Sequence, residues 1–209
     1  MIASEEQARA FTASLCDAAA MDRLEGLTSL LREENMRQNL IAKATVDELW
    51  LRHVADSAQL LRYVPRETGP WLDLGTGAGF PGLVIAAMRP DWPMRLVESR
   101  KRRVEWLQNA CKALALGRCE VIGERLERVE SFAAGVISAR AFAPMPRLVA
   151  LSARFSTKQT IWLLPKGRSA QQDLDQLPES RRKMFHVEHS LTDPEAGLII
   201  GGPALVPQP

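Results

Sequence analysis

The first 65 residues follow the spacing of amphipathic helices. A capping-box pattern at residues 4–7 opens an apolar series that continues through residues 11–19. A cluster of leucines at residues 24–31 indicates a second helix. A second capping-box pattern at residues 45–48 predicts the start of a third helix, whose apolar stripe runs through residues 49–61.

From residue 71 onward the pattern changes to short apolar runs that alternate with amphipathic stretches. Helices are predicted over residues 81–88 and 101–116. Two more apolar runs, at 185–188 and 198–200, have no long helix between them and predict an antiparallel pair. The other strands are predicted at 71–74, 94–98, 120–122, 135–138 and 160–164.

Strands that alternate with helices form βαβ units, whose right-handed crossovers build a parallel sheet covered on both faces. We therefore expect an α/β fold with a doubly wound, mostly parallel sheet and an antiparallel C-terminal edge strand. The expected organisation is an N-terminal helical segment (residues 1–65) packed on a second domain that comprises residues 66–209.

A glycine-rich loop between the first predicted strand and its helix carries the strongest functional signal. It reads Asp-Leu-Gly-Thr-Gly-Ala-Gly-Phe-Pro-Gly over residues 73–82. Ligands of such sheets bind at the carboxyl ends of the strands, and glycines there let the backbone approach them closely. The loop therefore predicts a ligand site.

Two registers of the loop suggest different ligands. Gly77, Gly79 and Gly82 satisfy the dinucleotide pattern G-x-G-x-x-G, which keeps an NAD(P)-dependent oxidoreductase open. The other register starts at Asp73, at the strand end, and runs through Gly75, Gly77 and Gly79; it resembles the S-adenosylmethionine (SAM) loop of class I methyltransferases. Glu98, at the end of the next strand, suits the ribose hydroxyls of either nucleoside.

Several segments together resemble one family, the small-subunit ribosomal RNA methyltransferase G family, also called glucose-inhibited division protein B. The most specific segment is Gly-Thr-Gly-Ala-Gly-Phe-Pro-Gly at residues 75–82. The other segments are Arg52-His53-x-x-Asp56-Ser57, Val97-Glu98-Ser99 with Lys101-Arg102, Arg125-Leu126-Glu127, Ser138-Ala139-Arg140-Ala141-Phe142 and Lys166-Gly167.

The resemblance implies a class I, Rossmann-like methyltransferase fold and SAM as the methyl donor. It also implies a target, N7 of guanine 527 in the 530 loop of 16S rRNA. Carried over to this sequence, the cofactor contacts would be Gly75, Phe80, Leu126, Glu127 and Arg140, in addition to the residues that the loop and strand pattern suggest.

The chemistry of guanine N7 requires little of the protein. This nitrogen has an in-plane lone pair and no proton, so no general base is expected. Catalysis would then consist mostly of orienting the two reactants. We expect Arg140 to orient the site through SAM or an RNA phosphate, and either Phe80 or Phe142 to stack on the target base or pack in the core.

Two other methyltransferase classes fit the sequence less well. The segment after the fourth strand lacks the Asn/Asp-Pro-Pro-aromatic motif that is common where exocyclic amines are methylated. Pyrimidine C5 methylation needs a cysteine nucleophile, whereas Cys111 and Cys119 fall on predicted core positions.

His53 and Asp56 lie three residues apart on one predicted helix face. Two such groups do not close a metal site, so no metal is expected. A pairing that fixes this helix against the sheet is the favoured interpretation.

The formal net charge of +2 conceals a segregation of charges along the chain. Residues 1–35 carry −4, residues 95–118 carry +5 and residues 140–183 carry +6. Basic residues beside the methyl donor would suit a phosphate backbone. The candidates for contact with 16S rRNA or the small ribosomal subunit are Arg100, Lys101, Arg102, Arg147, Lys166 and Arg168.

Length and composition set the remaining expectations. The chain has 209 residues, 46% hydrophobic and 25% charged, which is typical of a globular protein. Three cysteines without a CxxC pair argue against a disulfide framework or a structural zinc site. The polar N-terminus and the absence of a long apolar run predict a cytoplasmic protein without a membrane span. We also expect a monomer, and a SAM-dependent small-molecule methyltransferase remains an alternative.

Overall fold

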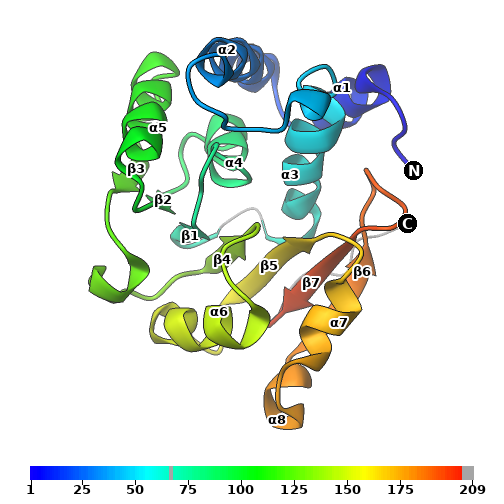
Figure 1. The fold of residues 1–209 in the computed structure, drawn as a ribbon, viewed down its shortest axis with the longest axis vertical. Coiled ribbons are helices and arrows are strands. Elements are labelled where there is room, and N and C mark those ends of the chain that lie inside the picture. The colour runs from blue at the N-terminus through cyan, green and yellow to red at the C-terminus, as the bar shows by residue number, and fades with distance from the viewer. Residues whose placement is uncertain (66–67, 204–209) are drawn as a thin grey trace.

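A seven-stranded sheet forms the centre of the computed structural model, which describes residues 1–65 and 68–203 (Figure 1). The strand order is β3-β2-β1-β4-β5-β7-β6, so the chain starts near the middle of the sheet and winds outward in both directions. The strands are β1 (Trp71–Leu74), β2 (Met94–Val97), β3 (Cys119–Ile122), β4 (Val136–Ala139), β5 (Ile161–Lys166), β6 (Phe185–His189) and β7 (Gly197–Gly201).

The five strands β1 to β5 pair in parallel, as their alternation with helices predicts. The antiparallel pair at the C-terminal side is also present. Its position differs in one detail, because β7 is the antiparallel strand and lies one place in from the edge, between β5 and β6. The doubly wound fold predicted from the sequence is confirmed.

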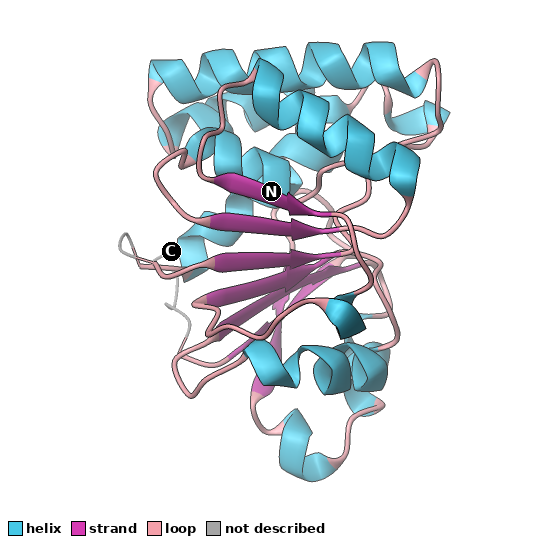
Figure 2. Ribbon diagram, turned by 90° about the vertical axis from the view of Figure 1, so that its left-hand side faces the viewer, coloured by secondary structure: helices cyan, strands magenta, loops and turns pink. Residues whose placement is uncertain are grey.

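Helices cover both faces of this sheet (Figure 2). Alternate side chains of each central strand enter two separate hydrophobic cores, since successive residues of a strand point to opposite faces. Trp71 and Leu163 belong to the core under α4 and α5, whereas Leu72 and Leu164 belong to the core under α6 and α7. The covering helices are α4 (Gly82–Met88), α5 (Lys101–Ala113), α6 (Met145–Ser152), η5 (Ala153–Phe155), α7 (Ala170–Asp175) and α8 (Glu179–Arg182).

The N-terminal helices α1 (Glu5–Ser14) and α2 (Ala18–Asn35) extend the first of these cores. The side chain of Ser4 caps α1 by accepting from the Gln7 backbone N–H, as the capping-box pattern predicts. Arg23 on α2 donates to the carbonyl of Ala87 at 2.7 Å, and this bond ties the N-terminal layer to α4. The predicted division between residues 65 and 66 falls at the edge of the described ranges and stays a prediction.

The predicted helix over residues 45–61 is wrong in its start and its regularity. The segment consists of η1 (Lys43–Thr45), a π-helical stretch η2 (Trp50–Ala55), one α-turn α3 (Asp56–Ala58) and a 3₁₀ stretch η3 (Gln59–Tyr63). Thr45 does not cap a helix; its hydroxyl donates to the Ala42 carbonyl and contacts His53. The capping carboxylate comes instead from Glu5, which accepts from the backbone N–H groups of Trp50 and Leu51.

Among residues 1–65 and 68–203, no helix is long and apolar enough to cross a bilayer.

The first residue of α4 is a glycine because there is no room for a side chain. A Cβ on Gly82 would lie 2.3 Å from Cδ2 of Leu96 and 2.8 Å from Oδ2 of Asp73. Both neighbours are fully buried, so neither has space to move away.

We expect Gly82→Ala to lower the free energy of unfolding by at least about 2 kcal/mol, because overpacking a rigid core costs about 1–3 kcal/mol. Gly117→Ala is the matched control, since a Cβ there meets nothing within 4 Å. It should stay within about 0.5 kcal/mol of wild type in the same urea titration. Equal losses in the two variants would contradict the packing argument.

Candidate functional site at the carboxyl edge of the sheet

A cavity of about 500 Å³ opens where the carboxyl ends of β1 to β4 meet. Each strand contributes the residues that follow it, as expected for ligand sites in open α/β sheets. The lining residues are Gly75 after β1, residues 97–100 and Arg103 around the start of α5, residues 124–127 after β3, residues 141–144 after β4, and Arg147 and Leu151 on α6.

The glycine loop makes its turn through backbone conformations that L-residues rarely adopt. Gly75 and Gly77 have φ angles of 63° and 61°. A Cβ on Gly75 would lie 2.7 Å from the ring of Phe142, which faces the loop across the cavity. The loop can therefore pack against the Phe142 ring only because residue 75 is a glycine.

Asp73 lies beneath this loop rather than in the cavity. Its side chain is fully buried, and Oδ1 accepts from the Ser138 hydroxyl at 2.7 Å while Oδ2 accepts from the Gly82 backbone N–H at 3.2 Å. Burial raises the pKa of Asp73 to about 6, although these hydrogen bonds favour the ionised form. Asp73 thus supports the loop, and the geometry does not support direct contact with a ligand.

Glu98 faces the cavity and organises its floor. One carboxylate oxygen accepts from the backbone N–H groups of Ser99 and Arg100, each at 2.8 Å, and the other accepts from Gly77 at 3.1 Å. Each carboxylate oxygen has two lone pairs, so one acceptor position is left for a ligand hydroxyl. The ribose role that the sequence suggests for Glu98 stays a prediction.

Leu126 and Glu127 form the opposite wall, on the short turn η4 (Leu126–Arg128) that follows β3. Leu126 is buried and offers an apolar surface. The Glu127 carboxylate accepts a hydrogen bond from the backbone N–H of Glu127 itself, which lowers the pKa of this carboxyl. Arg147 also forms an ion pair with the carboxylate, at 3.5 Å. Gly77, Gly79 and Phe80, which were also predicted to contact the cofactor, do not line this cavity.

A second cavity, of about 390 Å³, lies beside the first at the ends of β4 and β5. The two share Ala141, whose φ of 55° places its backbone in the left-handed region. The remaining lining residues are Thr45, Arg52, His53, Asp56, Arg140, Pro165, Lys166, Gly167, Asp173, Thr192, Asp193 and Ala196. The irregular helix of the N-terminal segment and the β6–β7 connection therefore both contribute to it.

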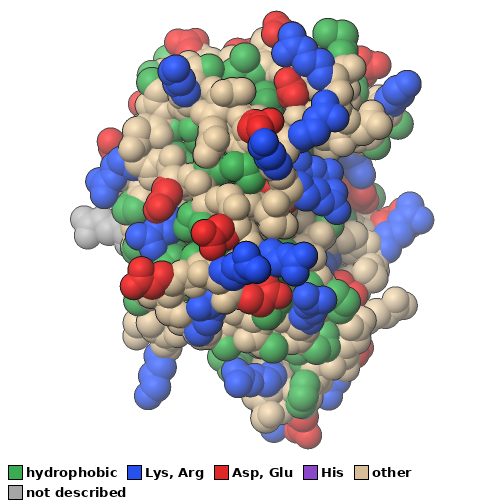
Figure 3. All heavy atoms as spheres, turned by 60° about the vertical axis from the view of Figure 1, so that its left-hand side comes forward, with side chains coloured by type: hydrophobic (Ala, Val, Ile, Leu, Met, Phe, Trp, Pro, Cys, Tyr) green, Lys and Arg blue, Asp and Glu red, His purple; other side chains and the backbone are tan. Residues whose placement is uncertain are grey.

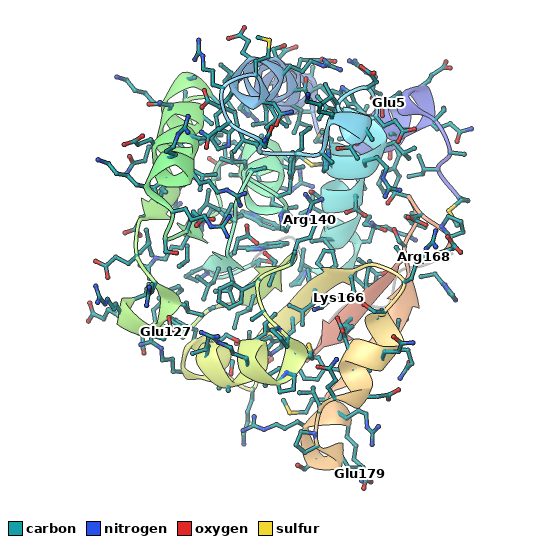
Figure 4. The ribbon with its side chains drawn as sticks, viewed as in Figure 1. Glu5, Glu127, Arg140, Lys166, Arg168 and Glu179 are labelled. Carbon is teal, nitrogen blue, oxygen red and sulfur yellow. The ribbon has the colours of Figure 1, made fainter. Side chains whose placement is uncertain are left out.

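Arg140 belongs to the second cavity and not to the first. Figure 4 shows it near the centre of the molecule, beside α3. Its guanidinium lies 3.7 Å from the Asp56 carboxylate, contacts Nδ1 of His53 and stands over the Phe80 ring, 5.0 Å from the ring centre. Burial lowers the pKa of Arg140, and the Asp56 carboxylate opposes that shift. His53 and Asp56 do fix their helix against the sheet, and Arg140 is the partner of both.

The cations proposed to meet RNA occupy different environments. Lys101 and Arg168 are largely exposed, with side-chain exposures of 90% and 80%. Lys166 is only 11% exposed and forms a 3.0 Å ion pair with Asp173, so it builds the wall of the second cavity. Arg100 and Arg147 line the first cavity.

Positive and negative side chains are interspersed on the face that brings α5 and β3 forward (Figure 3). The basic segment of residues 100–103 starts α5, and no acidic residue lies in the first turn of that helix.

Comparison with known proteins identifies the family. The family model "rRNA small subunit methyltransferase G" matches residues 20–194. A ribosomal RNA small subunit methyltransferase G from Erythrobacter litoralis is 61% identical over 201 residues, which cover 96% of this chain and 97% of the relative. One from Novosphingobium aromaticivorans is 60% identical and covers 88% of this chain and 81% of the relative.

The chain belongs to the rRNA small subunit methyltransferase G family.

Membership in this family confirms the resemblance read from the sequence motifs, and SAM-dependent methyl transfer to small-subunit rRNA is the activity class of the family. It disfavours the oxidoreductase alternative. Two solved structures share the fold at low identity: an SAH-bound Podospora anserina methyltransferase has a TM-score of 0.57 at 12% identity, with 87% of this chain and 88% of that chain covered. SAM-bound Aeropyrum pernix fibrillarin has 0.53 at 13%, with 72% and 75% covered.

Several residues of this family member's site were not found from the sequence. Thr45 carries the signal of a capping box, and Asp193 was not singled out, whereas both line the second cavity. Ser138 belongs to one of the family segments, but the pattern does not reveal that its hydroxyl bonds both Asp73 and the Trp71 indole N–H. In the described part of the chain, no three His, Cys, Asp or Glu side chains cluster as metal ligands.

The imidazole of His53 is buried, so the free energy of unfolding depends on whether this ring is protonated. Burial, together with repulsion from Arg140 and Arg52, lowers the pKa of His53 from 6.5 to about 3. Between about pH 6.5 and pH 3, His53 is therefore protonated in the unfolded chain but neutral in the folded chain. The contribution of His53 is fully present above pH 6.5 and is lost as the pH falls toward 3.

We expect the free energy of unfolding of wild type to fall between pH 6.5 and 4.5 more steeply than that of His53→Phe, which keeps a ring against Phe80 but has no titratable group. The limiting difference in slope is about 1.4 kcal/mol per pH unit. Urea titrations at four pH values measure both slopes. The raised pKa of Asp73 acts in the opposite direction but is common to both proteins. Parallel curves would contradict a buried neutral imidazole.

Proposed function

We propose that this protein transfers the methyl group of SAM to N7 of guanine 527 in the 530 loop of 16S rRNA. The observation that carries the proposal is the pair of adjoining cavities at the carboxyl edge, one suited to a nucleoside and the other to a base beside it, in a member of this methyltransferase family. We propose that the protein acts as a monomer. We expect that action in the cytoplasm, where the rRNA substrate would be met.

The first cavity has the donor and acceptor set that SAM requires. The free acceptor position of Glu98 suits the ribose hydroxyls, and Leu126 offers an apolar wall for the adenine. The Arg103 guanidinium, which lies near Gly77, suits the methionine carboxylate. We therefore assign cofactor contacts to Gly75, Glu98, Leu126 and Glu127, and a supporting role beneath them to Asp73, Gly77 and Gly79.

The second cavity suits the target base. When bound, SAM supplies an electrophilic methyl group, whose bond to sulfur breaks as the N7 lone pair of guanine forms the new bond to carbon. N7 has no proton to lose, so the residues of this chain orient the base and need not act as a base themselves. The guanine O6 is adjacent to N7 on the same edge of the ring, where Arg140 is the donor that suits it. Phe142 lines the first cavity and is the aromatic ring placed to border the reacting groups, whereas Phe80 packs against His53.

The start of α5 suits the RNA backbone. Cations in the first turn of a helix are unfavourable, because the helix dipole places positive charge there. Four consecutive basic residues, 100–103, nevertheless occupy this position without an acidic neighbour in the turn. A polyanion on this surface would relieve the repulsion. We assign phosphate contacts to Arg100, Lys101 and Arg102, and further contacts to Arg147 and Arg168.

Incubation with labelled SAM and unmethylated small ribosomal subunits, followed by chemical cleavage at 7-methylguanine, tests the assignment. One label per 16S rRNA, mapped to nucleotide 527, is expected. Arg140→Ala should lose turnover. Label at another nucleotide would overturn the specificity, and label absent from the RNA would overturn the function and favour a small-molecule substrate.

We expect Lys101→Gln/Arg102→Gln to weaken binding of the ribosomal subunit and to reduce the slope of log K against log salt by about 1 for each phosphate contact removed. Binding of SAM should be unchanged, since neither residue lines a cavity. The control Arg181→Gln/Lys183→Gln removes the same charge from α8 and should keep the wild-type slope. An identical response of the two pairs would argue for a general charge effect.

A further inference from the structure

Arg140 is held from three sides by residues that come from two distant parts of the chain. Phe80 of the glycine loop lies under its guanidinium, and His53 and Asp56 meet it from the irregular helix of the N-terminal segment. Its side chain is 27% exposed, so part of it still faces the second cavity. We propose that His53 is a positioning residue for Arg140 and that the Thr45 hydroxyl fixes the histidine tautomer that makes this possible. The kinetic test of this proposal rests on the function proposed above.

The hydrogen bonds around Thr45 determine which ring nitrogen carries the proton. The Thr45 hydroxyl donates its single hydrogen to the Ala42 carbonyl, with 2.9 Å between the oxygens. Its oxygen can then only accept from Nε2 of His53, 2.9 Å away. Nε2 therefore carries the hydrogen, and Nδ1 of the neutral ring has a free lone pair.

That lone pair faces the guanidinium. Both terminal nitrogens of Arg140 lie 3.3 Å from Nδ1 of His53. The opposite tautomer would turn an N–H group toward these donors, and an imidazolium would add charge repulsion. The lowered pKa of His53, about 3, keeps the ring neutral near pH 7. Only the Nε2–H tautomer is compatible with the observed position of Arg140.

A fixed guanidinium has a functional consequence. A free arginine side chain carries about 2 kcal/mol of rotamer entropy, part of which is lost whenever a ligand immobilises it. Contacts to Asp56, His53 and Phe80 remove that freedom before the substrate arrives. The guanidinium is then held in one orientation beside the second cavity, which Arg140 lines.

His53 does not act as a base in this arrangement. Its Nδ1 is covered by Arg140, its Nε2 is bonded to Thr45, and its ring stacks on Phe80 at a centroid distance of 4.8 Å. The competing interpretation is that His53 only packs the glycine loop through Phe80. The two roles differ in what happens when Thr45 loses its hydroxyl, because that change leaves the stack with Phe80 in place.

Thr45→Val removes the hydroxyl at nearly constant volume, and Thr45→Ser is the control that keeps it. Nitrogen-15 NMR of the histidine rings is a direct readout that needs no substrate. Wild type and Thr45→Ser should show His53 with a protonated Nε2 and a bare Nδ1, and Thr45→Val should show both tautomers. A single unchanged tautomer in Thr45→Val would overturn the role of Thr45.

Kinetics on small ribosomal subunits test the consequence. We expect Thr45→Val to lower kcat/KM for the subunit about tenfold, which corresponds to about 1.4 kcal/mol, with the Kd for SAM unchanged. Thr45→Ser should match wild type. In an Arg140→Lys background the further loss caused by Thr45→Val should vanish, since the effect runs through the guanidinium.

A loss that persists in the Arg140→Lys background, or that is accompanied by weaker SAM binding, would establish a packing role instead. Wild-type turnover in Thr45→Val would also overturn the proposal. These outcomes are distinct from failure of the proposed function, in which wild type itself would not methylate the subunit.

Discussion

The buried carboxylate of Asp73 links the elements that shape the carboxyl edge of the sheet, where both cavities lie. Asp73 sits at the carboxyl end of β1 with no exposure to solvent, and it joins the Ser138 hydroxyl of β4 to the first backbone N–H of α4. Ser138 in turn accepts from the Trp71 indole N–H, so these hydrogen bonds join β1, β4 and the start of α4. The raised pKa of Asp73 reflects the free-energy cost of this burial. The buried Asp73 fixes the local geometry, because the glycine loop and α4 start from the same anchored point.

The two cavities differ in the side chains that line them, which is why we propose different ligands for them. The ends of β1 to β4 shape the first cavity with a carboxylate, an apolar wall and glycine backbone. The ends of β4 and β5 shape the second with charged side chains, and these charges are paired with one another. Ala141 lines both cavities, so under the proposed function the methyl donor and the base would meet beside it. Family membership and this arrangement agree on the class of chemistry.

Most of the fold, and about half of the residues that line the two cavities, could be predicted from the sequence. Short apolar runs predicted the strands within a residue or two, because buried parallel strands leave a local signature. Glu98 and Gly75 follow strands, so the strand pattern places them at the carboxyl edge of the sheet, whereas Leu126 is predicted only by the family resemblance; all three line the first cavity. The sequence around Lys166 predicts an RNA contact and does not reveal the ion pair with Asp173. The capping-box pattern predicts a helix cap at Thr45 because that pattern is local, whereas its contact with His53 is set by tertiary packing.

The helix that holds Arg140 is itself held from the far end of the chain. Arg52 pairs with Asp193, Asp56 accepts from Thr192, and Gln59 donates to Ser190, across separations of 141, 136 and 131 residues. The residues of the first cavity, by contrast, all lie between positions 75 and 151. During synthesis all residues of the first cavity are therefore present while the chain is still growing, but the lining of the second is incomplete before Ala196 has emerged. The order of translation would thus supply the cavity that we propose for the methyl donor before the one that we propose for the base.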